Sequence, residues 1–323
     1  MNRKTFIKQA SAASLAIGLT TPSLSACMLK KQKIAKIGLG LFTAPRLFQE
    51  DVEKGIATLA ELGIQEFETY GPYTFSDARN HASWKALTPQ LGFDISGFLG
   101  LSLNEFQTLL KKYNISVPSM HTDLYTLEGS MGKLAEAANT LGANYVVLPA
   151  IPEAERATLD DYKRIAERFN AIGAAAKKEG IAFAYHNHGY GLVPNEQGIK
   201  PVDLIFDGTD PNLVFLEMDI FWTVAGRANP VELIQKHSGR YKMFHLKDMR
   251  ELTYFDGEGS NASEWMALFP KLVSAGSGVM PIDEIVQTAT AHGAEHFFIE
   301  HDFAPDPVEN IGSAARYLES LKW

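Results

Sequence analysis

The 323-residue sequence lacks several features that define common protein classes. It has one cysteine, Cys27, so no disulfide can form within the chain. Lys and Arg number 30 against 38 Asp and Glu, and a formal net charge of −8 offers no basic footprint for nucleic acid. No glycine-rich dinucleotide fingerprint follows the first expected strand, because Gly38 and Gly40 lie inside it. The sequence also has no internal repeat and no low-complexity segment.

The start of the chain differs from the rest and predicts export. A basic beginning is followed by a weakly apolar stretch, residues 10–19, which is too short to span a bilayer. The sequence LSAC that ends at Cys27 resembles a bacterial lipoprotein cleavage box, which would make Cys27 the lipidated N-terminus; an ordinary signal with a chance cysteine is the alternative. We therefore expect a periplasmic, membrane-anchored lipoprotein. Its expected segments are a signal peptide at 1–27, a basic tether at 28–33 and one domain at 34–323.

From Lys33 onward, short apolar runs alternate with amphipathic helical patterns. Eight such units favour an α/β fold of the (β/α)8 TIM-barrel type over an open Rossmann sheet. Residues 71–100 and 248–278 are expected to be a long loop over the barrel mouth and a long insertion. The expected strands are 34–42, 64–70, 114–122, 144–148, 181–188, 213–219, 241–247 and 296–300. The expected helices are 49–62, 102–113, 131–141, 159–179, 201–207, 230–236, 281–292 and 307–321.

Polar residues gather at the carboxyl ends of the expected strands. The clearest case is 181–188, IAFAYHNH, an apolar strand that ends with His186 and His188 on the same face. In a barrel all such ends converge on one mouth, where active sites lie. The polar strand-end residues are Glu68, His121, His186, His188, Glu217, Asp219, His245, Lys247, Glu300 and Asp302.

Each of these residues also has an ordinary interpretation. A lone histidine on a strand is more often a hydrogen-bonded structural residue than a ligand, and a lone carboxylate is more often a cap or an ion-pair partner. Polar endings on four successive strands favour a shared site over separate structural roles. Imidazole and carboxylate together suit a borderline divalent ion such as Mn²⁺, Co²⁺ or Zn²⁺.

These motifs resemble the sugar phosphate isomerase/epimerase family of xylose-isomerase-like TIM barrels. The resemblance covers about residues 33–323, and its most specific pieces are YHNH (185–188), FLEMDIFW (215–222), GRYKMFHLKDM (239–249) and FFIEHD (297–302). In that family one divalent metal is held by four strand-end residues, commonly Glu, Asp, His and Glu. The resemblance assigns the metal to His186, Asp219, His245 and Glu300. His186 stands where the family commonly has Glu, and the acidic residue that often follows HNH is missing here.

The resemblance implies proton abstraction next to a carbonyl, with a metal-stabilised enediolate. Glu300 is the expected base and His186 the second acid or base, with His188 or Glu217 as alternatives. We expect Mn²⁺, with Co²⁺, Zn²⁺ or Mg²⁺ as alternatives. The expected substrate-binding residues are Glu68, His121, His188, Glu217, Lys247 and Trp222, although packing is the more ordinary role for Trp222.

The expected export address bears on the substrate, because sugar phosphates are cytoplasmic metabolites. We therefore expect an isomerase or epimerase acting on a neutral sugar or keto-sugar. One alternative is a 3-keto-glycoside lyase or hydratase with the same metal site, and another is a non-catalytic sugar-binding lipoprotein. An endonuclease is disfavoured by the negative charge. The expected partners are a small carbohydrate and, through the lipid anchor alone, the membrane, with no nucleic acid.

Overall fold

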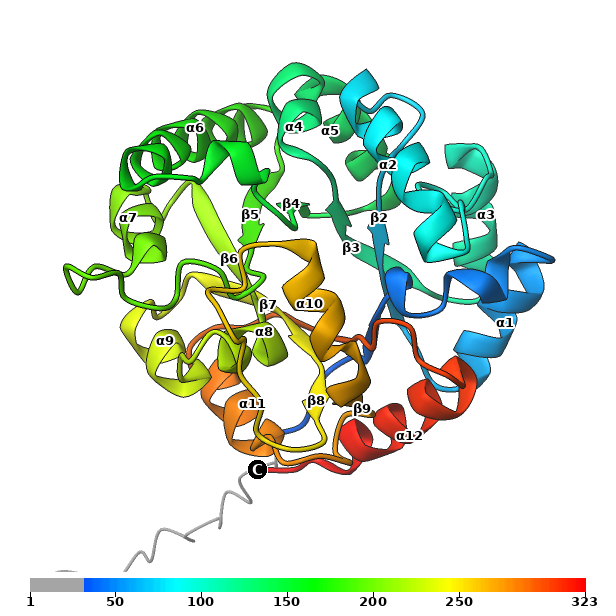
Figure 1. Cartoon of the computed structure of the whole chain (residues 1–323). Coiled ribbons are helices and arrows are strands. Elements are labelled where there is room, and N and C mark those ends of the chain that lie inside the picture. Colours follow the sequence, from blue (N-terminus) through cyan, green and yellow to red (C-terminus); the bar gives the residue numbers. More distant parts are fainter. Residues whose placement is uncertain (1–31) are drawn as a thin grey trace, which may run out of the picture. The chain divides into compact units, whose positions relative to one another are not determined.

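The computed structural model describes residues 32–323, so the expected signal peptide and the lipidation of Cys27 lie outside the described residues. Eight parallel strands close into a barrel in the order β1-β10-β7-β6-β5-β4-β3-β2. Figure 1 looks along this barrel and shows the strands at the centre of a ring of helices. The expected (β/α)8 barrel is confirmed.

Most expected elements are present, with bounds that differ by a few residues. The barrel strands are β1 (Gly38–Gly40), β2 (Glu66–Tyr70), β3 (Ser116–His121), β4 (Tyr145–Leu148), β5 (Ala182–His186), β6 (Val214–Asp219), β7 (Tyr241–Leu246) and β10 (His296–Ile299). The helices include α1 (Val52–Glu61), α2 (Ala78–Leu91), α3 (Leu103–Lys112), α4 (Leu124–Gly129), α5 (Met131–Leu141), α6 (Leu159–Lys178), α7 (Pro201–Gly208), α8 (Ile220–Ala225), α9 (Pro230–Lys236), α10 (Ala262–Leu268), α11 (Ile282–Ala291) and α12 (Pro307–Ser320).

The first strand is shorter than expected. Of residues 34–42, only β1 pairs in the barrel, and the chain then turns into a 3₁₀ helix at Leu41–Thr43. A Cβ atom on Gly38 would lie 2.4 Å from a ring carbon of Phe298 on β10. The close packing of these two neighbouring strands therefore requires glycine at this position.

The two segments expected to lack regular structure do contain it. Helix α2 lies within residues 71–100, and the insertion at 248–278 contains α10 and the antiparallel pair β8 (Asp248–Met249) and β9 (Leu272–Val273). The expectation of a loop at 71–100 was wrong because α2 buries none of its residues, so its sequence lacks the apolar stripe that identifies a helix.

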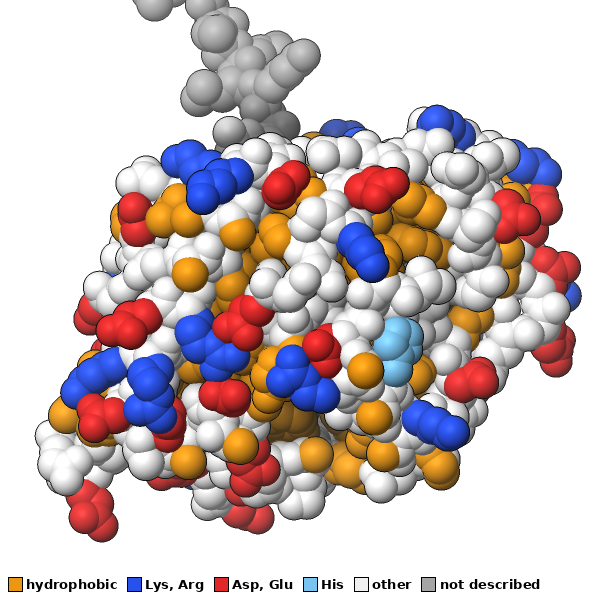
Figure 2. All heavy atoms as spheres, turned by 90° about the horizontal axis from the view of Figure 1, so that it is seen from above, with side chains coloured by type: hydrophobic (Ala, Val, Ile, Leu, Met, Phe, Trp, Pro, Cys, Tyr) orange, Lys and Arg blue, Asp and Glu red, His pale blue; other side chains and the backbone are white. Residues whose placement is uncertain are grey.

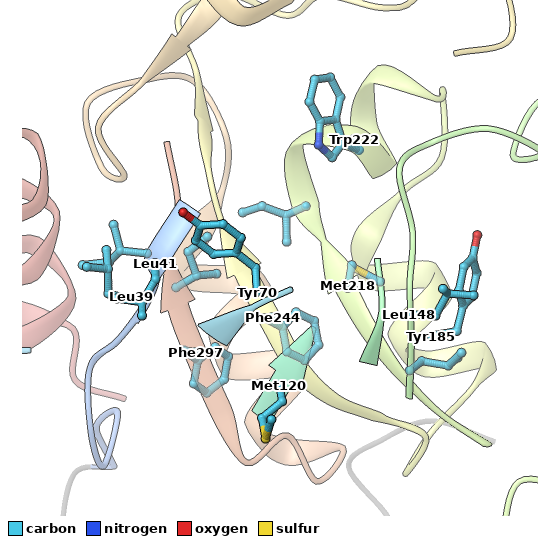
Figure 3. Packing of buried hydrophobic residues seen from close by; sticks show 14 of the residues in the cluster. Leu39, Leu41, Tyr70, Met120, Leu148, Tyr185, Met218, Trp222, Phe244 and Phe297 are labelled. Atoms are coloured by element: carbon cyan, nitrogen blue, oxygen red, sulfur yellow. The ribbon is translucent and has the colours of Figure 1, made fainter. Parts of the chain in front are cut away.

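Side chains that alternate along the strands separate an outer core from an inner one. Met120, Met218 and Phe244 belong to the large outer apolar layer, part of which is drawn in Figure 3. A second, smaller cluster fills the interior of the barrel. Its buried members are Tyr145, Val147, Ala184, Met243 and Phe298. This inner plug closes the barrel at one level, so the inward residues that follow it toward the carboxyl ends form the floor of the mouth.

The surface carries mixed charges. On the face seen in Figure 2, Lys and Arg side chains are interspersed with Asp and Glu, and apolar groups show between them. Among residues 32–323, no helix combines the length and the apolar character that a membrane crossing needs.

Candidate active site

Strands β6 and β7 illustrate how the sequence builds the site. On β7, Met243 belongs to the inner apolar plug, and His245, two residues further on, points to the same side. Lys247 follows directly after the strand. On β6, Glu217 and Asp219 occupy the last two inward positions, and both are fully buried. Polar groups are thus stacked on an apolar base, where they are shielded from water.

Five side chains form a buried network on this base, which we call the inner network: Glu68, His121, His186, Glu217 and His245. His121 Nε2 lies 2.9 Å from Glu68 Oε2 and 2.7 Å from Glu217 Oε2, so it links the two carboxylates. Each carboxylate holds one further histidine. His186 Nδ1 lies 2.9 Å from Glu217 Oε2, and His245 Nε2 lies 2.5 Å from Glu68 Oε2.

A second group of side chains surrounds the ammonium of Lys247. Its Nζ atom lies 3.1 Å from Asp219 Oδ2, 2.8 Å from Glu300 Oε2 and 2.6 Å from Asp302 Oδ2. His245 joins this group through its other nitrogen, because Nδ1 lies 2.6 Å from Glu300 Oε2. Three carboxylates around one ammonium leave a formal charge of −2 once His245 has released its proton to bind a metal, and a divalent cation would neutralise this charge.

Within residues 32–323, two carboxylate oxygens of the site are buried without a hydrogen-bond partner: Glu217 Oε1 and Asp219 Oδ2. Lys247 lies within ion-pair distance of the second oxygen, but not in hydrogen-bond geometry. Such oxygens are costly unless an ion or a ligand completes them. Two sets of residues could each bring their ligand atoms within 4.8 Å of one another. The first set is Asp219, His245 and Glu300, and the second is His121, His186, Glu217 and His245. This oxygen and nitrogen donor set fits a divalent metal ion.

Helix α8 explains why Asp219 keeps one oxygen for the site. The helix begins directly after β6, and Asp219 Oδ1 accepts a 2.9 Å hydrogen bond from the backbone N–H of Trp222. This N-cap fixes the carboxylate and leaves Oδ2 facing Lys247 and, at 3.9 Å, His186 Nε2. Trp222 itself is 1% exposed and stacks on Phe255, so it packs behind the site.

Burial and neighbouring charges shift the pKa values of the site residues in different directions. Burial would raise the pKa of Glu300, but the charges of His245 and Lys247 outweigh it and hold that pKa well below its ordinary value. Burial and the charge of Glu68 raise the pKa of Glu217 to about 7. Burial, followed by the charge of His245, lowers the pKa of His186 well below its ordinary value. The site therefore holds an ionised Glu300 beside a neutral His186.

A cavity of about 390 Å³ opens over the strand ends. Six of the strand-end residues named from the sequence line it: His121, His186, His188, His245, Glu300 and Asp302. Of the described residues, the other predicted site residues, Glu68, Glu217, Asp219, Lys247 and Trp222, are not among those that line it. They lie behind the cavity wall, so the predicted contacts of Glu68, Glu217, Lys247 and Trp222 with a substrate are not direct ones in this structure.

Sequence reasoning missed one wall of the cavity. Asn80, Trp84 and Leu87 line it from α2, and Phe42 and Asp123 contribute from other segments. The spacing of Asn80, Trp84 and Leu87 places them on one helical face, and this signal could have identified them had α2 been recognised.

Gly40, at the end of β1, lies beside the carboxylate of Glu300. A Cβ atom at this position would lie 3.2 Å from Glu300 Oε1 and 3.4 Å from Cδ. The missing side chain therefore leaves the room in which the Glu300 carboxylate sits.

The sequence and the barrel fold of this chain are similar to those of known proteins. The sequence profile of the xylose isomerase-like TIM barrel family matches residues 56–323, most of the chain. The chain belongs to this family. Among curated proteins, it is similar to the inosose dehydratase of Clostridium perfringens, with 36% identity over 92 residues. That match covers 28% of this chain and 30% of the relative, so the chain spans under a third of that relative's length.

Solved structures of family members extend the likeness over the whole barrel. A sugar phosphate isomerase/epimerase from Parabacteroides distasonis aligns with a TM-score of 0.68 at 21% identity, over 88% of this chain and 94% of that one. The IOLI protein with a bound zinc atom aligns with a TM-score of 0.60 at 15% identity, over 87% of this chain and 95% of that one. At these identities the likeness shows the fold.

Proposed function

We propose that this chain is a metal-dependent enzyme that removes a proton next to the carbonyl of a neutral sugar or keto-sugar, leading to isomerisation or epimerisation. The observation that carries the proposal is the cluster of Asp219, His245 and Glu300, whose ligand atoms lie within 4.8 Å of one another beside the cavity. Membership in a family with isomerase/epimerase structures, and a related IOLI protein with zinc, support it.

Asp219, His245 and Glu300 would hold the metal, with His186 as the fourth ligand and Mn²⁺ as the expected ion. A divalent ion bound there would act as a Lewis acid for oxygens of the substrate. The cluster fits this ion because its oxygen and nitrogen donors are buried, one carboxylate oxygen lacks a hydrogen-bond donor among the described residues, and the formal charge around Lys247 is −2.

The proton itself would pass to Glu300, which lines the cavity and is kept ionised by His245 and Lys247. Both nitrogens of His186 would be engaged, one by the metal and one by Glu217, so His188, which also lines the cavity, is the candidate for returning a proton to the neighbouring carbon. His188 Nδ1 lies 2.5 Å from the carbonyl oxygen of Pro149, which orients its ring toward the substrate space. The rings of Phe42, Tyr70 and Trp84 wall this space and would exclude water.

The residues that form the cavity wall are the reason for proposing a neutral substrate. Within the described part of the chain, no Lys or Arg is among the residues that line the cavity, and Lys247 is already surrounded by three carboxylates. A phosphate group would find no cationic partner there. Export to the periplasm by residues 1–27, which would bring the enzyme to such sugars, is part of the same proposal.

A lyase or dehydratase is the second candidate. After the same proton removal, a hydroxyl group on the next carbon would take up a proton and leave as water, or a glycosidic oxygen would take up a proton and leave as the alcohol, and a carbon–carbon double bond would form in place of proton return. The likeness to an inosose dehydratase favours this reaction. Both candidates require the same base, so they differ in the product and not in the first step.

The test is proton exchange in D₂O. The protein without residues 1–27 is loaded with Mn²⁺, and neutral ketoses and 3-keto-glycosides are followed for deuterium uptake by NMR after the metal is removed. Exchange that disappears with chelator and in Glu300→Gln would support the proposal, and the products would separate isomerase from lyase. Sugar binding without exchange would overturn it in favour of a sugar-binding lipoprotein.

A further inference from the structure

The inner network has a role that the cavity does not explain, because two of its members, Glu68 and Glu217, are buried behind the wall. We propose that Glu217 is a positioning residue that holds His186 through Nδ1 and so presents Nε2 of that histidine as a metal ligand. This inference rests on the proposed function for the presence of the metal. It accounts for a histidine at the position where the resemblance implies a carboxylate ligand.

The geometry around His186 carries the argument. An ionised Glu217 can only accept a hydrogen bond, so in that state its 2.9 Å contact through Oε2 with His186 Nδ1 places the proton on Nδ1. A neutral imidazole protonated at Nδ1 has its lone pair at Nε2. That atom lies 3.9 Å from Asp219 Oδ2, a separation that leaves room for an ion to contact both atoms.

His245 differs, because both of its ring nitrogens contact a carboxylate, so Nδ1 would have to release its proton before it could bind a metal. Its Nε2 contacts Glu68, and its Nδ1 lies beside Glu300. His121 joins Glu68 to Glu217, so the two supporting carboxylates share one link across the barrel. Histidine ligands whose second nitrogen is bound to a carboxylate have a fixed ring orientation and greater basicity, and loss of such a partner typically weakens metal binding 10–100-fold.

The test measures metal binding and needs no substrate. Co²⁺ affinity is determined by chelator competition for four proteins: the wild type, Glu217→Gln, His186→Ala and the double variant. We expect Glu217→Gln to weaken binding by about 10–100-fold. In the His186→Ala background, the same change should have no further effect, because Glu217 would act through His186.

A matched control comes from the other end of the barrel. Glu66 is also buried on β2, and its Oε2 lies 2.7 Å from His296 Nδ1, so Glu66→Gln breaks a similar pair away from the site. Its Co²⁺ affinity should equal that of the wild type. Equal weakening by Glu66→Gln and Glu217→Gln, or a full effect of Glu217→Gln without His186, would overturn the inference.

Two further results keep the test decisive. If Glu217→Gln does not fold, ¹⁵N NMR of the wild-type imidazoles with Zn²⁺ replaces it: a proton on Nδ1 and metal on Nε2 of His186 supports the inference, and the reverse overturns it. Two ions per chain would also overturn it, because the inner network would then itself hold metal. A wild type that binds no ion would defeat the proposed metal site as well, whereas unchanged affinity in Glu217→Gln defeats the positioning role alone.

Discussion

Glu66 and Glu68 are two residues apart on β2, both point into the barrel, and both pair with a histidine, yet they belong to different environments. Glu66 has a donor for each oxygen, since Oε2 contacts His296 and Oε1 lies 3.3 Å from the half-exposed Lys36. Glu68 is part of a larger network in which a neighbouring carboxylate oxygen has no hydrogen-bond donor among residues 32–323. Burial of charge is therefore common to both ends of the barrel, and incomplete pairing is what distinguishes the mouth.

The largest difference between the two ends should appear in catalysis. Glu300→Gln keeps the shape of the side chain and removes its ability to accept a proton. We expect the rate of deuterium exchange to fall by about 10²–10⁴-fold, the usual contribution of a general base. Retention of full exchange in this variant would remove Glu300 as the base.

Lys247→Met should give the largest loss of stability. The substitution leaves three buried carboxylates without their shared cation, and breaking such buried pairs costs about 3–5 kcal/mol. Urea unfolding without metal measures this change. As a control, Lys242→Met removes a partly exposed pair with Glu295 and should cost only about 0–1 kcal/mol. Similar losses in both variants would contradict the proposed charge balance at the mouth.

Glu66→Gln should separate stability from function. Its oxygens lose charge-assisted hydrogen bonds at the closed end of the barrel, and we expect a loss of about 1–3 kcal/mol in unfolding free energy. Exchange activity of the folded variant should stay close to that of the wild type, since the partners of Glu66, His296 and Lys36, are not residues of the site. A large loss of activity would mean that the two ends of the barrel are coupled.

The smallest effect should come from His237, which follows α9 and lies outside the site. Burial, then the charges of Lys236 and Arg240, lowers its pKa to about 4. In the unfolded state His237 has a pKa of about 6.5 and binds a proton more readily than in the folded state. His237 should therefore make the protein less stable as the pH falls from 6.5 toward 4. His237→Asn should flatten this part of the curve of melting temperature against pH. An unchanged slope would contradict the assignment.

The barrel could be predicted because its evidence is periodic. Along a barrel strand such as β6, apolar residues come first and polar residues follow at the carboxyl end. This order indicates both the fold and the end of the barrel at which polar groups meet. Helix α2 could not be predicted in the same way. None of its residues is fully buried, although Trp84 and Leu91 pack against the core, so no continuous apolar stripe marks it.

The same contrast applies to the site. The sequence indicated that Asp219, His245 and Glu300 would converge, because they follow strands that must be neighbours in a barrel. The sequence could not distinguish residues that line the cavity from residues that are buried behind its wall. Glu217 and His186 both lie near the carboxyl ends of their strands, and the difference between them depends on side-chain contacts that residue spacing does not contain.

Gly40 offers a practical consequence of this arrangement. Because a methyl group there would lie 3.2 Å from Glu300 Oε1, Gly40→Ala should shift the carboxylate of the proposed base without altering any charge or any ligand atom. Redesign of the reaction could begin on β1, beside Glu300, with the smallest side chain that moves the proposed proton acceptor.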